Sequence, residues 1–88
     1  MNPPRTVVVA GTEQQARLWA ARRGLSLRAW YSVGPDDGHA LLEIRGLDGR
    51  RGTLVKVGTY GERRDINELS AQLNMQGFDW SGAPVEQP

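Results

Sequence analysis

Hydrophobic and polar positions divide this chain into alternating strand and helix patterns. Residues 6–10, TVVVA, are apolar on both faces, which is typical of a strand covered on both sides. Residues 25–33 alternate apolar and polar side chains, and residues 53–58 form a third strand pattern in which Lys56 marks one face as partly wet. Residues 12–23 and 59–76 repeat apolar side chains at a helical spacing. The pattern therefore predicts three strands and two longer helices.

Both longer helices carry signals for their ends. Thr12 begins a Thr-x-x-Gln sequence and Thr59 a Thr-x-x-Glu sequence. This is the spacing of a capping box, in which two side chains satisfy free backbone N–H groups. A glycine in each case, Gly24 or Gly77, is placed to adopt the left-handed conformation that ends a helix. We therefore expect helices that begin near Thr12 and Thr59.

The segment between the second and third strands has two interpretations. After the turn residues 34–38, Leu41, Ile44 and Leu47 recur at the spacing of a short helix. The alternative pairs LLEIR with TLVKV as an antiparallel hairpin around GLDGRRG. We favour the helix.

The order of these elements predicts a small three-layer α/β domain with a parallel sheet. Because the first strand is apolar throughout, we place it in the centre, which gives the three-stranded order 2-1-3 with helices on both faces. Residues 6–80 form this domain, and Trp80 is expected to fold back onto the core. Residues 1–5 form a lead-in and residues 81–88, SGAPVEQP, a disordered tail.

Composition narrows the classes of function. The 88 residues include no Cys, which leaves out disulfides, thiolate catalysis and the common zinc motifs. A net charge of +1, with arginine pairs scattered along the chain, does not favour nucleic-acid binding. No apolar stretch approaches the roughly 20 residues of a membrane helix, and the start MNPPRTVVVAGTE lacks the hydrophobic region of a signal peptide. We expect a cytoplasmic protein.

Two similar strand–helix junctions suggest a possible binding site. In the order 2-1-3, the ends of the first and third strands meet where the sheet reverses direction, and open α/β sheets bind ligands there. Glycine permits close backbone approach, and two helix N-termini would present free N–H groups to an anion. The candidates for an anion or nucleotide site are Gly11, Thr12, Gly58, Thr59, Tyr60 and Arg64. The alternative is that both Gly-Thr pairs are structural caps, which is the commoner role of such junctions.

A second candidate surface lies on the strand predicted for residues 25–33. Arg28, Trp30 and Ser32 share its more polar face. An exposed Trp beside Arg could lie under a protein partner, and an edge strand there could pair with a second copy. More often such a Trp is covered by the protein's own helix or tail.

The sequence shows no catalytic set. His39 is the single His and follows a glycine in a loop, and Asp36-Asp37 is typical of a turn, without further ligands spaced for a metal site. The Gly-Thr junctions lack the Lys of a P-loop and the third Gly of a dinucleotide fingerprint. We therefore expect no enzymatic activity, no metal and no cofactor.

The stretches VVVAGTEQQARLWAARRGL and VKVGTYGERRDINEL resemble those of small uncharacterised proteins encoded by actinobacteriophages. The resemblance covers about residues 6–73 and consists of short motifs. It implies a phage accessory protein in the host cytoplasm that binds a host or phage protein, and it assigns no site residues.

Two functions follow as hypotheses. The favoured one is a non-enzymatic protein that binds another protein or itself. The alternative is a module that binds a nucleotide or a phosphate ligand with the two Gly-Thr junctions.

Overall fold

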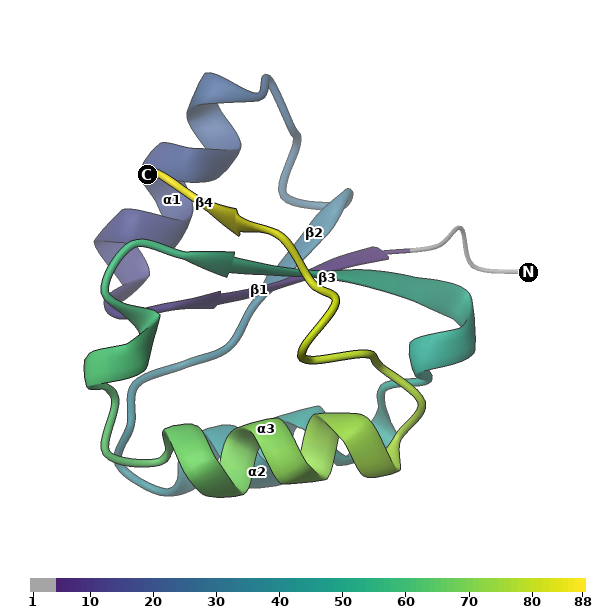
Figure 1. Ribbon diagram of the computed structural model, residues 1–88. Coiled ribbons are helices and arrows are strands. Elements are labelled where there is room, and N and C mark those ends of the chain that lie inside the picture. The colour runs from purple at the N-terminus through teal and green to yellow at the C-terminus, as the bar shows by residue number, and fades with distance from the viewer. Residues whose placement is uncertain (1–4) are drawn as a thin grey trace.

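A four-stranded, all-parallel sheet forms the middle layer of the protein (Figure 1). The computed structural model describes residues 5–88. The strands are β1 (Arg5–Ala10), β2 (Trp30–Ser32), β3 (Gly52–Val57) and β4 (Val85–Glu86). Their order in the sheet is β2-β1-β3-β4, so the expected order 2-1-3 is confirmed and a fourth strand is added at the edge. Residues 1–4, most of the expected lead-in, lie outside the described residues, and Arg5 already belongs to β1.

Helices cover both faces of the sheet. Helix α1 (Glu13–Arg22) packs on one face, and α2 (His39–Glu43) and α3 (Ile66–Met75) lie together on the other (Figure 1). Short 3₁₀ turns complete the connections at Ile44–Gly46, Gly49–Arg51 and Tyr60–Glu62. Within the described residues, no helix is long and apolar enough to cross a membrane.

The core has two halves, divided by the sheet. Because successive side chains of a strand point to opposite faces, Val8 faces α1 while Val7 and Val9 face α2 and α3. Each of these valines is buried, which explains why β1 is apolar throughout and lies inside the sheet. The half under α1 also contains Ala10, Ala16, Trp19, Ala20, Trp30, Val55 and Val57. The other half also contains Val33, Ala40, Ile44, Leu54, Leu69, Leu73 and Phe78.

The expected helix ends are confirmed at both glycines. Gly24 has a φ of 66°, and the Leu25 N–H donates to the Ala20 carbonyl at 3.0 Å. Gly77 has a φ of 98°, and the Phe78 N–H donates to the Leu73 carbonyl at 3.0 Å. In each of these hydrogen bonds an N–H donates to the carbonyl five residues earlier, which satisfies a carbonyl group near the end of the helix.

The middle segment forms a helix, as favoured from the sequence. Helix α2 continues into the 3₁₀ turn Ile44–Gly46, and Ala40 and Ile44 are buried against the sheet. The Gln76 side chain also donates to the carbonyls of Ile44 and Leu47, which fastens this segment to the end of α3. The hairpin alternative is wrong because residues 39–46 are helical, and β3 pairs in parallel with β1 on one side and with β4 on the other.

The strand expected over residues 25–33 is much shorter than its alternating pattern suggested. Only Trp30–Ser32 is a strand, and a turn precedes it in which the Ala29 N–H donates to the Ser26 carbonyl at 2.9 Å. Alternation is a local property, whereas the length of β2 is set by where β1 can pair with it, from Thr6 to Val8.

The disordered tail expected over residues 81–88 is also a wrong prediction. Val85 and Glu86 pair in parallel with Lys56 and Val57 as β4. Trp80 packs against the core as expected, and it turns the chain back towards this edge of β3. The tail has the composition of a loop, but its backbone forms hydrogen bonds with the groups that the open edge of β3 would otherwise leave without a partner.

Lys56 does not mark a wet face, contrary to expectation. Lys56 is only 7% exposed, and its Nζ donates to the Trp80 carbonyl at 2.9 Å. The ammonium also lies 5.1 Å from the centre of the Trp80 ring and 5.8 Å from that of Tyr60, within the range of a cation–π contact. The returning tail thus covers the side chain that seemed polar and exposed in the sequence.

Candidate functional site

The two Gly-Thr junctions meet at the carboxyl ends of β1 and β3, and Gln15 joins them. The side-chain oxygen of Gln15, Oε1, accepts hydrogen bonds from the Gly11 N–H at 3.1 Å and from both the N–H and the hydroxyl of Thr59 at 3.2 Å. Thr12 caps α1, since its hydroxyl accepts from the Gln15 N–H at 3.2 Å. The capping box at Thr12 is therefore half formed, because the Gln15 amide reaches across to the second junction instead of back to Thr12.

Glycine is needed at the first junction because the two chain segments touch. A Cβ atom added to Gly11 would lie 2.0 Å from the Thr59 hydroxyl and 2.8 Å from its backbone carbon. At the second junction Gly58 has a φ of 59°, in the left-handed region, and faces the Gln15 amide. The repeated Gly-Thr sequence thus brings two strand ends into direct contact.

The second junction does not open a helix. Thr59 begins the 3₁₀ turn Tyr60–Glu62 without capping it through its side chain, and α3 begins only after Asp65. The capping box expected between Thr59 and Glu62 is thus not formed. Arg63 interrupts the helical course with an extended backbone. One of the two helix N-termini on which the anion hypothesis depends is therefore absent from this junction.

Arg63, which is not among the site residues predicted from the sequence, explains this interruption. Its side chain is 2% exposed and makes a paired contact with Asp65, from Nε to Oδ1 at 2.9 Å and from Nη2 to Oδ2 at 3.0 Å. The same guanidinium donates to the Ala10 carbonyl at 3.0 Å and the Gly34 carbonyl at 2.7 Å. It thereby ties the end of β1 and the loop after β2 to the start of α3. The sequence alone shows only that Arg63 is followed by a second arginine, Arg64.

Arg64 and Tyr60 do not converge with the other anion candidates. The Arg64 side chain is 90% exposed, and its backbone N–H donates to the Asp36 carboxylate at 3.0 Å. This backbone hydrogen bond is the main cause that lowers the pKa of Asp36, and the nearby Arg64 charge adds to it. The Tyr60 ring packs edge-on against the Trp80 ring, with 5.9 Å between the two ring centres. Of the six candidates, the structure brings together Gly11, Thr12, Gly58 and Thr59, around Gln15.

The outer edge of β2 is a second candidate site. The Thr6 N–H donates to the Ala29 carbonyl and the Val33 N–H to the Val8 carbonyl, so the odd-numbered peptide groups of β2 face β1. In a parallel pair the intervening residues then direct their N–H and C=O groups away from β1. These are Trp30 and Ser32, and no strand within residues 5–88 pairs with them.

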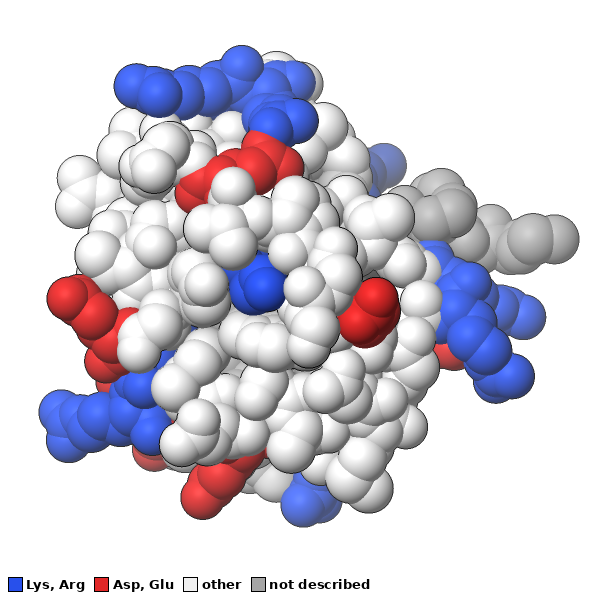
Figure 2. Space-filling view, in the orientation of Figure 1, with Lys and Arg blue, Asp and Glu red and all other residues white. Residues whose placement is uncertain are grey.

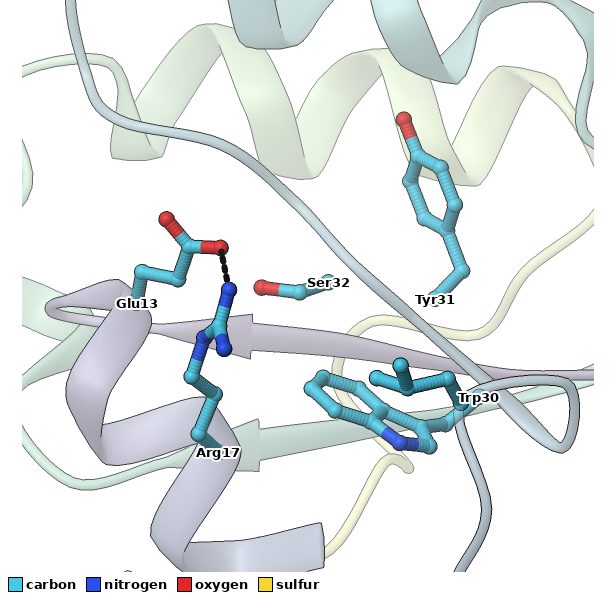
Figure 3. A pocket seen from close by; sticks show the side chains of 6 residues that line it. Glu13, Arg17, Trp30, Tyr31 and Ser32 are labelled. Carbon is cyan, nitrogen blue, oxygen red and sulfur yellow. Dashed lines mark hydrogen bonds and ion pairs between the residues drawn. The ribbon is translucent and has the colours of Figure 1, made fainter.

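A hollow of about 230 Å³ lies beside this edge (Figure 3). In Figure 3 the Ser32 side chain points towards an ion pair on α1, in which Arg17 Nη2 lies 3.2 Å from Glu13 Oε1. Leu27 also lines the hollow and is 78% exposed. The edge thus offers backbone hydrogen-bonding groups, one apolar side chain and two opposite charges.

The three residues expected on an exposed strand face do not form one. Trp30 is 8% exposed and packs under α1 in the core, so the interpretation in which the protein's own helix covers it is confirmed. Arg28 lies in the turn before β2, and Ser32 follows Trp30 on the same side of the strand. Tyr31 points to the opposite face (Figure 3), where its hydroxyl donates to Glu43 at 3.2 Å. Burial and the Glu43 charge raise the pKa of Tyr31 to about 12.

Charges elsewhere on the described surface are paired or dispersed. On the face in Figure 2, most Lys and Arg side chains lie near the margins in separate groups, with acidic groups between them. Glu86 of β4 pairs with Arg23 and accepts from Trp19 Nε1 at 3.2 Å. Within residues 5–88 no group of three or more His, Asp or Glu side chains is placed to hold a metal ion.

Comparisons of the chain with protein-family models, curated proteins and solved structures found no match.

Proposed function

We propose that this protein is a small, non-enzymatic phage accessory protein that binds another protein through the outer edge of β2. The observation that carries the proposal is the edge itself, which no strand of residues 5–88 pairs with and where Trp30 and Ser32 direct their peptide groups outward beside the exposed Leu27. An extended segment of a partner can add to such an edge as a further strand. Its backbone would supply the hydrogen bonds, and the hollow would select its side chains.

The resemblance to actinobacteriophage proteins supports the phage origin, and the host cytoplasm is the compartment that it implies. Binding of a nucleotide or phosphate at the Gly-Thr junctions has less support, because Gln15 Oε1 already accepts N–H groups that an anion would use. Those junctions are better explained as a contact that holds β1 and β3 together.

Affinity capture from an actinobacterial lysate tests the proposal when it is combined with edge variants. Ser32→Pro removes an outward N–H without touching the bonds to β1, and proline is tolerated on edge strands. Leu27→Lys places a charge beside the hollow. Leu42→Lys is its matched control, because Leu42 is 59% exposed on α2, on the other face of the sheet.

We expect the captured proteins to be lost with Ser32→Pro and Leu27→Lys and kept with Leu42→Lys. Circular dichroism should show the same fold for all three variants. Capture that is equal for all of them would overturn the assignment of binding to this edge. So would an absence of both captured proteins and self-association in the unaltered protein.

A further inference from the structure

The chain contains two Asp-Gly sequences, Asp37-Gly38 and Asp48-Gly49. An aspartate before glycine isomerises readily, because glycine has no side chain to shield its backbone nitrogen from the neighbouring carboxyl carbon. In each sequence the carboxylate accepts from the backbone N–H two residues on, that of His39 at 3.1 Å and that of Arg50 at 3.0 Å. This hydrogen bond spans the Asp-Gly peptide and holds the carboxyl group beside it. The two carboxyl groups are therefore held alike, and the two sites differ at their glycines.

The backbone of Gly49 is fastened and enclosed. Its N–H donates to the Gln76 carbonyl at 2.9 Å, so this nitrogen is committed to another group. A Cβ atom added to Gly49 would lie 2.2 Å from the backbone of the turn after α3, which leaves the segment no room to rearrange. The Arg50 backbone N–H, together with nearby arginine charges, also lowers the pKa of Asp48. The protonated acid, from which water can leave, is therefore scarce at this site.

Gly38 has neither of these restraints. A Cβ atom added to it would meet nothing within 4 Å, and within residues 5–88 its N–H donates to no acceptor. Asp37, Gly38 and His39 are all exposed. The Gly38 nitrogen is therefore free to approach the Asp37 carboxyl carbon while the protein stays folded.

From this contrast we propose that Asp37 is a site of spontaneous modification in the folded protein, where it converts to isoaspartate, and that the fold protects Asp48. In the first step the Gly38 nitrogen bonds to the Asp37 carboxyl carbon, and the OH of the acid leaves with the amide proton as water. In the second step water cleaves the bond between this nitrogen and the original backbone carbonyl. The chain then runs through the former side chain and is longer by a methylene group. The mass is unchanged, and no oxidant or cofactor is consumed.

The turn that contains Asp37 is tied to the start of α3. The Gly34 carbonyl accepts from Arg63 Nη2 at 2.7 Å, and the Asp36 carboxylate accepts from the Arg64 N–H at 3.0 Å. A longer backbone directly after Asp36 changes the connection between these contacts and α2. None of these groups belongs to the β2 edge, so this inference is independent of the proposed function.

Ageing the folded protein, and the same protein in urea, tests the proposal. Peptide mapping by electron-transfer mass spectrometry distinguishes isoaspartate from aspartate at each site. In the folded protein we expect isoaspartate to accumulate at least about tenfold faster at position 37 than at position 48, a difference of about 1.4 kcal/mol in the barrier. In urea, where Gln76 no longer holds Gly49, the two rates should become similar.

A matched pair of variants assigns the reaction to its site. A methyltransferase that recognises isoaspartate labels the aged, folded protein. Asp37→Glu should abolish the labelling, because closure of a larger imide ring is much slower. Asp48→Glu should leave it unchanged. Circular dichroism before ageing verifies that both variants have the fold of the unaltered protein.

Three results would overturn the proposal. One is equal accumulation of isoaspartate at the two positions in the folded protein. Another is isoaspartate that forms at position 37 only in urea, which would show that the open backbone of Gly38 does not permit the reaction in the folded protein. The third is labelling that persists undiminished in Asp37→Glu.

Discussion

At the scale of single residues, two polar side chains hold the carboxyl ends of the sheet together. Gln15 bridges the two Gly-Thr junctions with one oxygen, and Arg63 binds carbonyl groups from two other segments. Both satisfy backbone groups that strand ends leave without a ladder partner. A region that looks like a ligand site in the sequence is therefore occupied by the protein's own side chains.

Replacing Gln15 tests this bridge. Gln15→Ala leaves three donors of Gly11 and Thr59 without their acceptor, and because water can reach the Thr59 donors we expect it to lower the free energy of unfolding by about 0.5–1.5 kcal/mol. Gln14→Ala is the matched control, an exposed neighbour on the same helix, with an expected change within about 0.5 kcal/mol. Urea unfolding of both variants provides the measurement. Equal effects would show that the bridge does not stabilise the protein.

Arg63 and Arg64 form a second matched pair. Arg63→Met leaves the Asp65 carboxylate buried without its partner, and breaking a buried pair in this way costs about 3–5 kcal/mol. Arg64→Gln changes a side chain in solvent and should cost less than about 0.5 kcal/mol. Thermal melts in phosphate and in chloride at matched ionic strength should show no phosphate stabilisation that depends on Arg64. Selective phosphate stabilisation that Arg64→Gln abolishes would revive the anion site.

At the scale of elements, β4 shows how a short segment without a strand pattern becomes a strand. Its backbone accepts from the Lys56 and Gly58 N–H groups, through the carbonyls of Pro84 and Glu86, at 2.9 and 3.0 Å. The Glu86 side chain then contacts Trp19 and Arg23 of the α1 segment. These contacts link residues that are far apart in the chain, so no local pattern could indicate them.

Truncation tests β4. A chain that ends at Ala83 loses the acceptors for Lys56 and Gly58, and we expect their amide protons to exchange with solvent much faster, as measured by NMR. A chain that ends at Glu86 keeps β4 and should retain the protection. Undiminished protection in the shorter chain would contradict the pairing of β4 with β3.

At the scale of the whole molecule, the three-layer arrangement explains which surfaces remain for binding. Both faces of the sheet are covered by helices, so even Trp30 is buried, and what stays open is the sheet's edges. The edge at β3 is partly closed by β4, whereas the edge at β2 lies beside a hollow. An interaction through the β2 edge therefore follows from the architecture more than from any motif.

The amino-acid sequence by itself determined the features that depend on near neighbours. The apolar run of β1, the Thr12 cap, the stops at Gly24 and Gly77 and the helical stripe of the middle segment were all readable, and they led to the parallel order 2-1-3. Each depends on backbone geometry or on a periodicity of burial within a few residues.

Only the tertiary structure decided what depends on distant partners. β2 is a strand only where it pairs with β1. The tail forms β4 because it pairs with the open edge of β3, and Lys56 is buried because Trp80 covers it. Likewise Gln15 reaches Thr59, 44 positions away, and Arg63 reaches Ala10, 53 positions away. The sequence does not distinguish a polar side chain that faces solvent from one that faces a distant carbonyl group. Its role is therefore fixed only when folding brings that group within hydrogen-bonding distance.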